Sequence, residues 1–483
     1  MAYDNMCHCN LYLEYSEHLM SSETRIDESE AIVAHRRQLG ARLFAEANNL
    51  KRTAEALAAE LGMNPETIRG VFAGEEDLRV ARQLLDAMME AYPISLSDVW
   101  VDGPDTHGGV VVMRAADSSR SSRVFVRKSR AGVSKPYMEY KDTAMSRLAP
   151  FRPETVRPLH VVEDDDPDNI TLAYNNGHLL HQLTFFVGDV NAYWITSGRR
   201  SSVRLVTGDS TYMAPYVAHS FASRNSEALG LTIAVTYHGE LQPALPALGR
   251  IEPSVALDLC GDLRNPASAF RAILMRYASA ESVSADSLSD MLTVPGIMSA
   301  RRAAQIVRGD EVPSADEVRH IADVIGVRPT ELLICPLEPS EEVVVRRAAE
   351  TKERPFPDSS HVAALLRPLA RTRHQPGLRG FAMKVIGDAD TASRFRHHLH
   401  EYAYNYGDRP VRLVWQGGRD TIMEPGDSAY IEPTISHGFG FCGRPADLLI
   451  IRVPGTLTDA AFRELSGYGS DRERAVVEFR QWF

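Results

Sequence analysis

The chain has 483 residues, 44% of them hydrophobic, which is enough for about three or four compact units. Its formal net charge is −11, whereas proteins that bind nucleic acid usually carry a basic face. No stretch approaches the roughly 18 apolar residues of a membrane helix, and the N-terminus lacks a basic segment followed by an apolar one. We therefore expect a cytoplasmic protein that binds neither membranes nor nucleic acid.

An N-terminal tail is predicted over residues 1–30 and a helical domain over 31–105. Within this domain Asn64 resembles an N-cap, Pro65 the first residue of a short helix, and Gly74 the end of that helix. The segment is typical of a helix-turn-helix. A related helical pattern covers 249–340. In it, Gly296 and Gly309 occupy roughly the positions that Gly62 and Gly74 occupy in the first helical domain.

Short β-strands separated by Gly, Asp, Asn and Pro turns follow each helical segment. The first set includes 124–126, 183–187, 202–206 and 231–237. The corresponding set in the second repeat includes 381–386, 412–415 and 447–453. Strands of this kind indicate a β-sandwich or barrel of the jelly-roll type. We expect one barrel over 106–248 and another over 341–483, the latter with a C-terminal tail. Residues 101–109 and 354–360 are expected to be connectors.

The repeat can be followed residue by residue, since Gly208 precedes His219 and Gly426 precedes His437 by the same number of positions. His178 and His397 likewise precede equivalent Gly-Asp pairs. The sequence therefore predicts an α+β chain in which a helical domain plus a β-barrel domain occurs twice.

Three side chains of the first barrel form a candidate iron site: His178, Gln182 and His219. Mononuclear iron(II) oxygenases hold the metal with three protein ligands on one face. Positions i and i+4 of a strand point to the same side, which favours His178 and Gln182 together and excludes His181. Gln182 is unusual because most such sites use a carboxylate. Alternatively, the histidines are structural and Gln182 only packs.

The second barrel carries a complete set of two histidines and one carboxylate, His397, Glu401 and His437. This set either binds a metal too or is an evolutionary remnant that no longer binds one. Groups that suit a tetrahedral anion accompany the first set: Asn175, Arg130, Tyr140 and Lys51. In the second repeat Arg394-Phe395-Arg396 replaces Asn175-Asn176-Gly177, and residues 278–310 contain no lysine. We therefore expect one active site, in the first barrel, and a structural or degenerate second barrel.

These motifs resemble the hydroxyethylphosphonate dioxygenase and methylphosphonate synthase family, which is related to hydroxypropylphosphonate epoxidase. The resemblance covers nearly the whole chain and is carried by residues 51–62, 130–140, 174–182 and 207–221. It implies two cupin barrels (double-stranded β-helices), each joined to a helix-turn-helix-like domain. It also implies that His178 and His219 bind Fe(II), that Asn175, Arg130 and Tyr140 hold a phosphonate, and that Lys51 closes over it. Tyr137 competes with Tyr140 for the phenol role.

The third ligand separates the two activities of the family. The dioxygenase uses a glutamate shortly before its second histidine, but no acid lies between Ser210 and His219 here. The synthase uses a glutamine four residues after its first histidine, as Gln182 stands here. The resemblance thus implies O2-dependent cleavage of 2-hydroxyethylphosphonate to methylphosphonate and CO2 or bicarbonate. Separately, we expect a homo-oligomer. The alternative products are hydroxymethylphosphonate and formate.

A helix-turn-helix joined to a barrel could instead form a transcriptional regulator. Residues 31–100 contain eight basic and ten acidic side chains, and the segment 65–73, which would be the recognition helix, has one arginine. A helix that binds in the DNA major groove normally presents several basic or amide side chains. We therefore favour a helical unit that serves packing and does not bind DNA. A barrel enzyme that does not consume oxygen is the remaining alternative.

Overall fold

The computed structural model describes all residues except 1–27, 101–102, 104, 390–393 and 483. The chain divides into two compact units, residues 1–107 with 458–483, and residues 108–457. Helices and antiparallel sheets occur together, which confirms the predicted α+β class. The predicted tail lies outside the described residues up to position 27, and helix α2 already begins at Glu28.

The first unit is helical, and its turns follow from local capping. Asn64 accepts a 2.8 Å hydrogen bond from the backbone N–H of Glu66, Pro65 begins α4, and Gly74 ends it with φ +71°. These positions confirm the sequence-based prediction. The C-terminal segment 458–483 belongs to this unit. The helices are α2 (Glu28–Asn49), α3 (Ala54–Leu61), α4 (Pro65–Ala73), α5 (Leu78–Ala91), α6 (Leu96–Val99), α14 (Asp459–Ser466) and α15 (Arg472–Trp482).

The helices that lie between the two barrel segments in the sequence have their own apolar core around Phe270, Leu274 and Leu288. Gly309 ends α12 with φ +78°, as Gly74 ends α4. Gly296 lies in the turn after α11, whose C-cap is Thr293, so it does not correspond to Gly62. The helices here are α8 (Leu245–Leu248), α9 (Pro253–Leu259), α10 (Pro266–Ala280), α11 (Ala285–Leu292), α12 (Ala300–Arg308) and α13 (Ala315–Ile325).

Each barrel combines a seven-stranded and a three-stranded antiparallel sheet. In the first, the sheets have the orders β11-β8-β5-β10-β4-β3-β2 and β7-β6-β9. Its own segment supplies nine strands and a short helix: β2 (Arg123–Lys128), β3 (Ser134–Asp142), β4 (Phe151–Pro158), β5 (His181–Val187), β6 (Val190–Thr196), β7 (Arg199–Leu205), β8 (Ser210–Met213), β9 (Ala218–Ser223), β10 (Leu231–Tyr237) and α7 (Ala115–Arg120).

The second barrel repeats this plan with the orders β1-β18-β15-β20-β14-β13-β12 and β17-β16-β19. Residues 354–357 form a strand, so the predicted connector over 354–360 is wrong at its start. The strands are β12 (Arg354–Pro357), β13 (Val362–Pro368), β14 (Arg379–Val385), β15 (His400–Tyr404), β16 (Val411–Trp415), β17 (Arg419–Met423), β18 (Ser428–Ile431), β19 (His437–Phe441) and β20 (Ala446–Val453).

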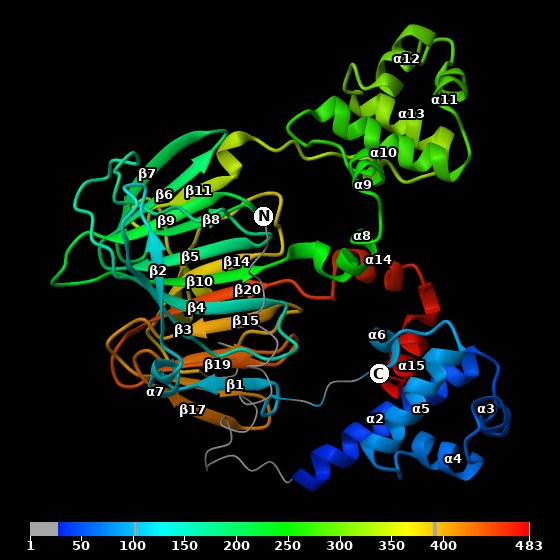
Figure 1. The fold of residues 1–483 in the computed structure, drawn as a ribbon, viewed down its shortest axis with the longest axis horizontal. Helices are drawn as coiled ribbons and strands as arrows, with labels where there is room; N and C mark the ends of the chain where they lie inside the picture. Colours follow the sequence, from blue (N-terminus) through cyan, green and yellow to red (C-terminus); the bar gives the residue numbers. More distant parts are fainter. Residues whose placement is uncertain (1–27, 101–102, 104, 390–393, 483) are drawn as a thin grey trace. The chain divides into compact units, whose positions relative to one another are not determined.

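The two barrels exchange one strand each. Strand β1 (Val110–Met113) precedes the first barrel but pairs with β18 of the second, and β11 (Val343–Arg346) precedes the second barrel but pairs with β8 of the first. Figure 1 shows cyan β1 among the orange strands and yellow-green β11 among the green ones. The domain boundaries 106–248 and 341–483 remain predictions. The strand pairing shows that each barrel includes one strand from outside its predicted range.

Buried aspartates fix both exchanged strands at equivalent positions. Asp209 accepts hydrogen bonds of 2.9 Å from Arg347 and 2.8 Å from the backbone N–H of Ala348. Asp427 likewise accepts hydrogen bonds of 2.8 Å from the side chain of Arg114 and 2.8 Å from the backbone N–H of Ala115. A carboxylate buried without such partners would be strongly destabilising, so these two aspartates require the exchanged segments to be in place.

Alternation along the strands decides which side chains enter a barrel. On β5, Leu183 and Phe185 belong to an apolar core shared with the second barrel, whereas Phe186 packs in the core of the first. Gln182 therefore points with Phe186 into the first barrel. On β15, Tyr402 belongs to the shared core and Ala403 to the core of the second barrel, so Glu401 points into the second barrel.

Among the helices that the structure describes, none combines the length and apolar character of a bilayer-spanning segment. Cys260, Cys335 and Cys442 are unpaired thiols exposed at the surface. Cys7 and Cys9 lie outside the described residues.

Candidate metal centre and anion pocket

The first barrel brings His178, Gln182 and His219 together. Nε2 of His178 lies 3.2 Å from Oε1 of Gln182, and the rings of His178 and His219 are 5.5 Å apart at 88°. Gln182 is 4% and His219 6% exposed, so the cluster lies inside the barrel. Two imidazoles and an amide oxygen converging in this way are a chemically suitable donor set for a divalent metal with open coordination positions.

The contact between His178 and Gln182 has a different origin from the one we expected. Strand β5 begins at His181, so His178 lies in the loop before it and the two residues are not on one strand. The backbone carbonyl of His178 accepts a 2.8 Å hydrogen bond from the N–H of Tyr216, which has φ +63°. The loop is thereby tied to the turn before β9 (Ala218–Ser223), which carries His219. His181 faces away and contacts the hydroxyl of Tyr212 through Nδ1 at 2.7 Å.

The proton position on His219 is set by the backbone. Its Nδ1 lies 2.9 Å from the carbonyl oxygen of Val217, which accepts the single N–H of a neutral imidazole, so Nε2 carries the lone pair and faces the side chain of Asn175. Burial lowers the pKa of His219 to about 4, and the charges of His178 and Arg127 act in the same direction. A ring that stays neutral near pH 7 can offer Nε2 as a metal ligand.

Thr184 is a positioning residue that the sequence analysis missed. Nε2 of Gln182 donates a 2.8 Å hydrogen bond to Oγ1 of Thr184, so Oε1 is the atom left to face His178. Thr184 is fully buried. The signal was available, because Thr184 stands two positions after Gln182 and must point to the same side of β5.

Asn175 faces the same space as the histidines. Its Oδ1 accepts hydrogen bonds from the backbone N–H groups of His219 at 2.7 Å and Gly177 at 3.0 Å. Its Nδ2 is consequently directed at Nε2 of His219, 3.0 Å away. A substrate bound at the metal ligands would meet this amide donor.

Arg127 is an arginine whose charge acts on His219, whereas Arg130 does not contribute to the pKa of that ring. Arg130 lies in the turn after β2 and donates a 2.8 Å hydrogen bond to the carbonyl oxygen of Asp168. Arg127 lies on β2, with its guanidinium 5.7 Å from the ring centroid of Tyr137. Its charge also lowers the pKa of His219.

Tyr137 and Tyr140 differ in what remains free on their hydroxyls. Tyr137 is fully buried, with its hydroxyl 2.8 Å from Oγ of Ser220 and accepting 3.0 Å from the N–H of Ala173. Burial also raises the pKa of Tyr140, and the charge of Arg127 opposes that rise. Tyr140 is only half-buried, and its hydroxyl is hydrogen-bonded to Arg127, the arginine whose charge acts on His219.

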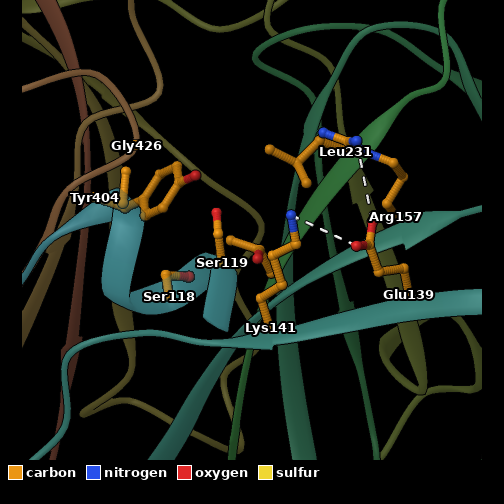
Figure 2. Close-up of a pocket in the computed structure, with 10 residues that line it drawn as sticks. Ser118, Ser119, Glu139, Lys141, Arg157, Leu231, Tyr404 and Gly426 are labelled. Carbon is orange, nitrogen blue, oxygen red and sulfur yellow. Dashed lines mark ion pairs between the residues drawn. The ribbon is translucent and has the colours of Figure 1, made fainter. Parts of the chain in front are cut away.

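The other face of β3 lines a separate cavity between the barrels. Glu139 and Lys141 flank Tyr140 in the chain and so point to the opposite side. Figure 2 shows them in this cavity, with ion pairs from Glu139 to Lys141 at 3.5 Å and to Arg157 at 4.0 Å, and with Tyr404 of the second barrel nearby. The metal-ligand candidates do not line it.

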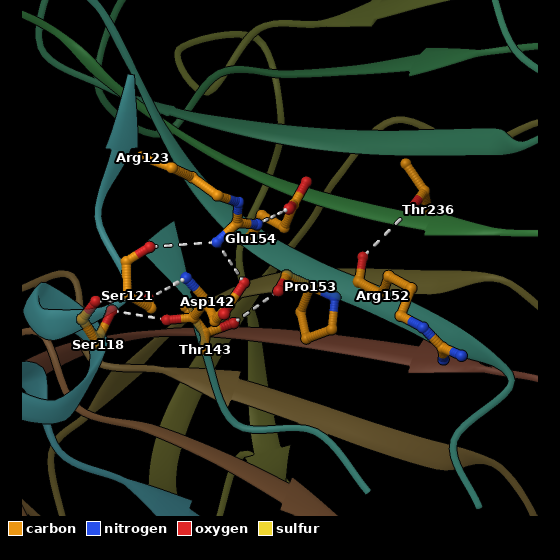
Figure 3. Close-up of polar contacts among 9 residues, drawn as sticks. All are labelled: Ser118, Ser121, Arg123, Asp142, Thr143, Arg152, Pro153, Glu154 and Thr236. Atoms are coloured by element: carbon orange, nitrogen blue, oxygen red, sulfur yellow. Dashed lines mark hydrogen bonds and ion pairs between the residues drawn. The ribbon is translucent and has the colours of Figure 1, made fainter. Parts of the chain in front are cut away.

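Strands β2, β3 and β4 are fixed to one another by the polar network in Figure 3. Arg123 of β2 forms 2.7 Å ion pairs with Asp142 of β3 and Glu154 of β4. Ser121 accepts a 2.8 Å hydrogen bond from the N–H of Asp142. Because Arg123 pairs with Tyr140 across the sheet, this network fixes the register that places Tyr140.

Lys51 belongs to the helical unit that contains residues 1–107, not to the unit that holds the barrels. It has φ +59°, and its ammonium lies 3.3 Å from the carbonyl oxygen of Asn48. Its predicted role at the substrate remains a prediction.

The chain is similar to characterised phosphonate enzymes over nearly its whole length. It is 32% identical over 451 residues to methylphosphonate synthase of Nitrosopumilus maritimus, covering 90% of this chain and 93% of the relative. It is 31% identical to Streptomyces albus HEPD, solved with 2-hydroxyethylphosphonate and Fe(II) bound, with a TM-score of 0.80 over 93% of this chain and 99% of that one.

A cadmium-bound structure of PhpD shares the fold at 18% identity, with a TM-score of 0.68 over 92% of this chain and 99% of that one. No protein-family model matches the sequence. The identity and coverage of the first two relatives confirm the predicted family. The chain belongs to the methylphosphonate synthase and 2-hydroxyethylphosphonate dioxygenase family of iron(II) oxygenases.

Proposed function

We propose that the protein is a methylphosphonate synthase that cleaves the carbon–carbon bond of 2-hydroxyethylphosphonate with O2. The observation that carries the proposal is the amide of Gln182, whose Oε1 faces His178 where the second barrel has the carboxylate of Glu401. The stretch before His219 contains no carboxylate that could replace it. The similarity to a methylphosphonate synthase along 90% of the chain supports the same assignment.

His178, Gln182 and His219 hold Fe(II), which supplies O2 binding and a positive charge for the substrate oxygens. The amide ligand adds no negative charge, so the centre favours an anionic substrate that chelates through its own oxygens. Thr184 positions the amide by holding its Nε2, and Val217 positions His219 by holding its Nδ1.

The phosphonate lies between Asn175, Arg127 and Tyr140. The Nδ2 group of Asn175 and the hydroxyl of Tyr140 donate hydrogen bonds, and the guanidinium of Arg127 supplies charge. Arg130 was the arginine expected from the resemblance, but its hydrogen bond to Asp168 supports Arg127 instead. Lys51 stays a prediction from the resemblance, as a cation that excludes water above the substrate.

The product separates the two activities of the family. Iron-loaded protein is incubated aerobically with 2-hydroxyethylphosphonate and the products are identified by phosphorus NMR. Methylphosphonate is the expected product. Hydroxymethylphosphonate would assign the chain to the dioxygenase activity, and unchanged substrate in the presence of bound iron would contradict both. O2 as cosubstrate, a homo-oligomeric state and a cytoplasmic location belong to the same proposal.

A further inference from the structure

The second barrel holds a donor cluster with the geometry of a metal site. Nε2 of His397 and Nε2 of His437 each lie 2.9 Å from an oxygen of Glu401. The two rings are 5.7 Å apart at 85°, close to the values in the first barrel. Ligand atoms about 2.1 Å from one ion and at right angles are roughly 3 Å apart. Within the part of the chain that the structure describes, this is the cluster of histidine, cysteine and carboxylate side chains that could hold an ion.

The hydrogen-bonding groups of this cluster require a positive charge between the two histidines and Glu401. Nδ1 of His397 lies 3.0 Å from the carbonyl oxygen of Leu399, and Nδ1 of His437 lies 2.9 Å from that of Ile435. A neutral imidazole has one N–H, which both rings use on the backbone. When both rings are neutral, their Nε2 lone pairs face the oxygens of Glu401 at 2.9 Å, and a positive charge between them is needed. A proton on each Nε2 supplies that charge in the empty cluster, and a divalent ion ligated by all three groups supplies it in the loaded one.

Arg452 orients the carboxylate but does not replace such an ion. Its Nε donates a 2.6 Å hydrogen bond to Oε2 of Glu401, which is fully buried, and its guanidinium lies 4.8 Å from the ring centroid of Phe395. Nε2 of His397 faces this same oxygen, whereas Nε2 of His437 faces the other carboxylate oxygen, Oε1. Carboxylates that bind metals commonly have a second partner of this kind. Arg452 faces Glu401 across β15 and β20, where the first barrel has the uncharged pair Thr236 and Gln182.

Further arginines of this barrel gather with Arg452 around the ring of Phe381. The guanidinium carbons of Arg354, Arg371 and Arg452 lie 5.2, 5.8 and 5.5 Å from the ring centroid of Phe381. Nε of Arg371 is buried and has no hydrogen-bond partner among the described residues. Burial lowers the pKa of Arg371, and the charge of Arg354 acts in the same direction. A metal bound beside these cations is favoured when an anion fills its open positions.

We propose that the second barrel is a second metal centre, in which His397, Glu401 and His437 bind a divalent transition-metal ion and the arginine-lined side accepts a small oxyanion. Two histidines with one carboxylate suit Fe(II) or Mn(II). The centre is separate from the iron site of the first barrel, and its occupancy does not depend on turnover of a phosphonate.

The direct test is anomalous diffraction from wild-type crystals loaded anaerobically with Fe(II), together with the metal content of the desalted protein. We expect peaks in both barrels and about two ions per chain, one for each three-ligand set. His219→Ala should remove the first peak and keep the second, and His437→Ala should do the reverse. A peak confined to the first barrel, with about one ion per chain, would overturn the proposal.

The anion is tested on His219→Ala protein loaded with Mn(II), so that the spectrum reports the second barrel alone. Inorganic phosphate should change the electron paramagnetic resonance signal, and Arg371→Gln should weaken that response about tenfold or more. A signal insensitive to phosphate would overturn the assignment of an oxyanion. Loss of methylphosphonate formation would leave both measurements unaffected, so failure of the proposed function remains distinguishable.

Discussion

The amide nitrogen of Gln182 donates a 2.8 Å hydrogen bond to the hydroxyl of Thr184. This contact decides which end of the amide faces His178, because the two ends differ in hydrogen-bonding character. The second barrel has Ala403 at the equivalent position, beside a carboxylate whose two oxygens are alike and which Arg452 holds.

Replacing Thr184 by valine should weaken iron binding about 10- to 100-fold, the usual effect of losing a group that orients a ligand. The measurement is Fe(II) affinity by anaerobic titration. Thr184→Ser keeps the hydroxyl and should retain most of the affinity. Equal affinity in the valine and serine variants would show that the hydroxyl does not orient Gln182.

Gln182→Glu should change the products, because a carboxylate ligand adds a negative charge to the metal centre. We expect tighter iron binding and less methylphosphonate, with hydroxymethylphosphonate or unreacted substrate in its place, as measured by phosphorus NMR. Gln83→Glu makes the same chemical change at an exposed position of α5 and should leave the products unchanged. Wild-type product and rate in Gln182→Glu would mean that residue 182 is not a ligand.

Asn175→Asp should raise KM for the substrate at least about tenfold, since it removes an amide donor and places a carboxylate beside a dianion. The backbone hydrogen bonds to Oδ1 can persist in the aspartate, so we expect the melting temperature to stay close to the wild-type value. Asn176→Asp, on the exposed neighbour, is the matched control. If both variants kept the wild-type KM, Asn175 would have no role in binding the phosphonate.

The two arginines near β2 give a paired test. Arg127→Gln should raise KM about 10- to 100-fold through loss of a charge-assisted contact. Arg130→Gln should stay within about twofold, because an exposed interaction of this kind contributes little. The reverse ranking would restore the role that the resemblance assigns to Arg130.

Glu317 gives the second helical domain a pH-dependent stability. Arg302 donates hydrogen bonds of 2.7 and 2.9 Å to the two carboxylate oxygens, and these, with a bond from the N–H of Ser314, lower the pKa of Glu317 to about 2. A carboxyl with a lowered pKa stabilises the folded state above its ordinary pKa, and this contribution disappears as the pH falls towards about 2.

Glu317→Gln should therefore cost about 1–2 kcal/mol near pH 7 and little near pH 2. Hydrogen exchange in α12 and α13 of the full chain reports the loss. Glu281→Gln, at an exposed position of the same domain, should show no such dependence on pH. A loss for Glu317→Gln that is constant between pH 2 and 7 would contradict the assignment.

Features that depend on neighbouring residues were predictable from the sequence. The cap at Asn64 and the turn at Gly74 need only a side-chain acceptor and a residue that tolerates positive φ, and both predictions are confirmed. The strand over 231–237 is found with the predicted bounds. The spacing that paired His178 with Gln182 also led to residues in contact, although a loop rather than a strand makes the contact.

Features that depend on distant segments were not predictable. A register shift between Phe125 and Val126 changes how β2 lies on β3, and no local pattern shows which of Arg127 and Arg130 then lies near His219. The arginines around Phe381 come from three separate strand regions, which only the folded barrel brings together.

The exchange of β1 and β11 also determines when each barrel can be completed during synthesis. The first barrel lacks its edge strand until the ribosome has passed residue 346, after the whole second helical domain. Until then β8 exposes unpaired backbone groups, which favour pairing with other chains. For the same reason a fragment cut between the repeats carries an open sheet edge, so the two halves are interdependent as expressed polypeptides although each has the outline of a complete barrel.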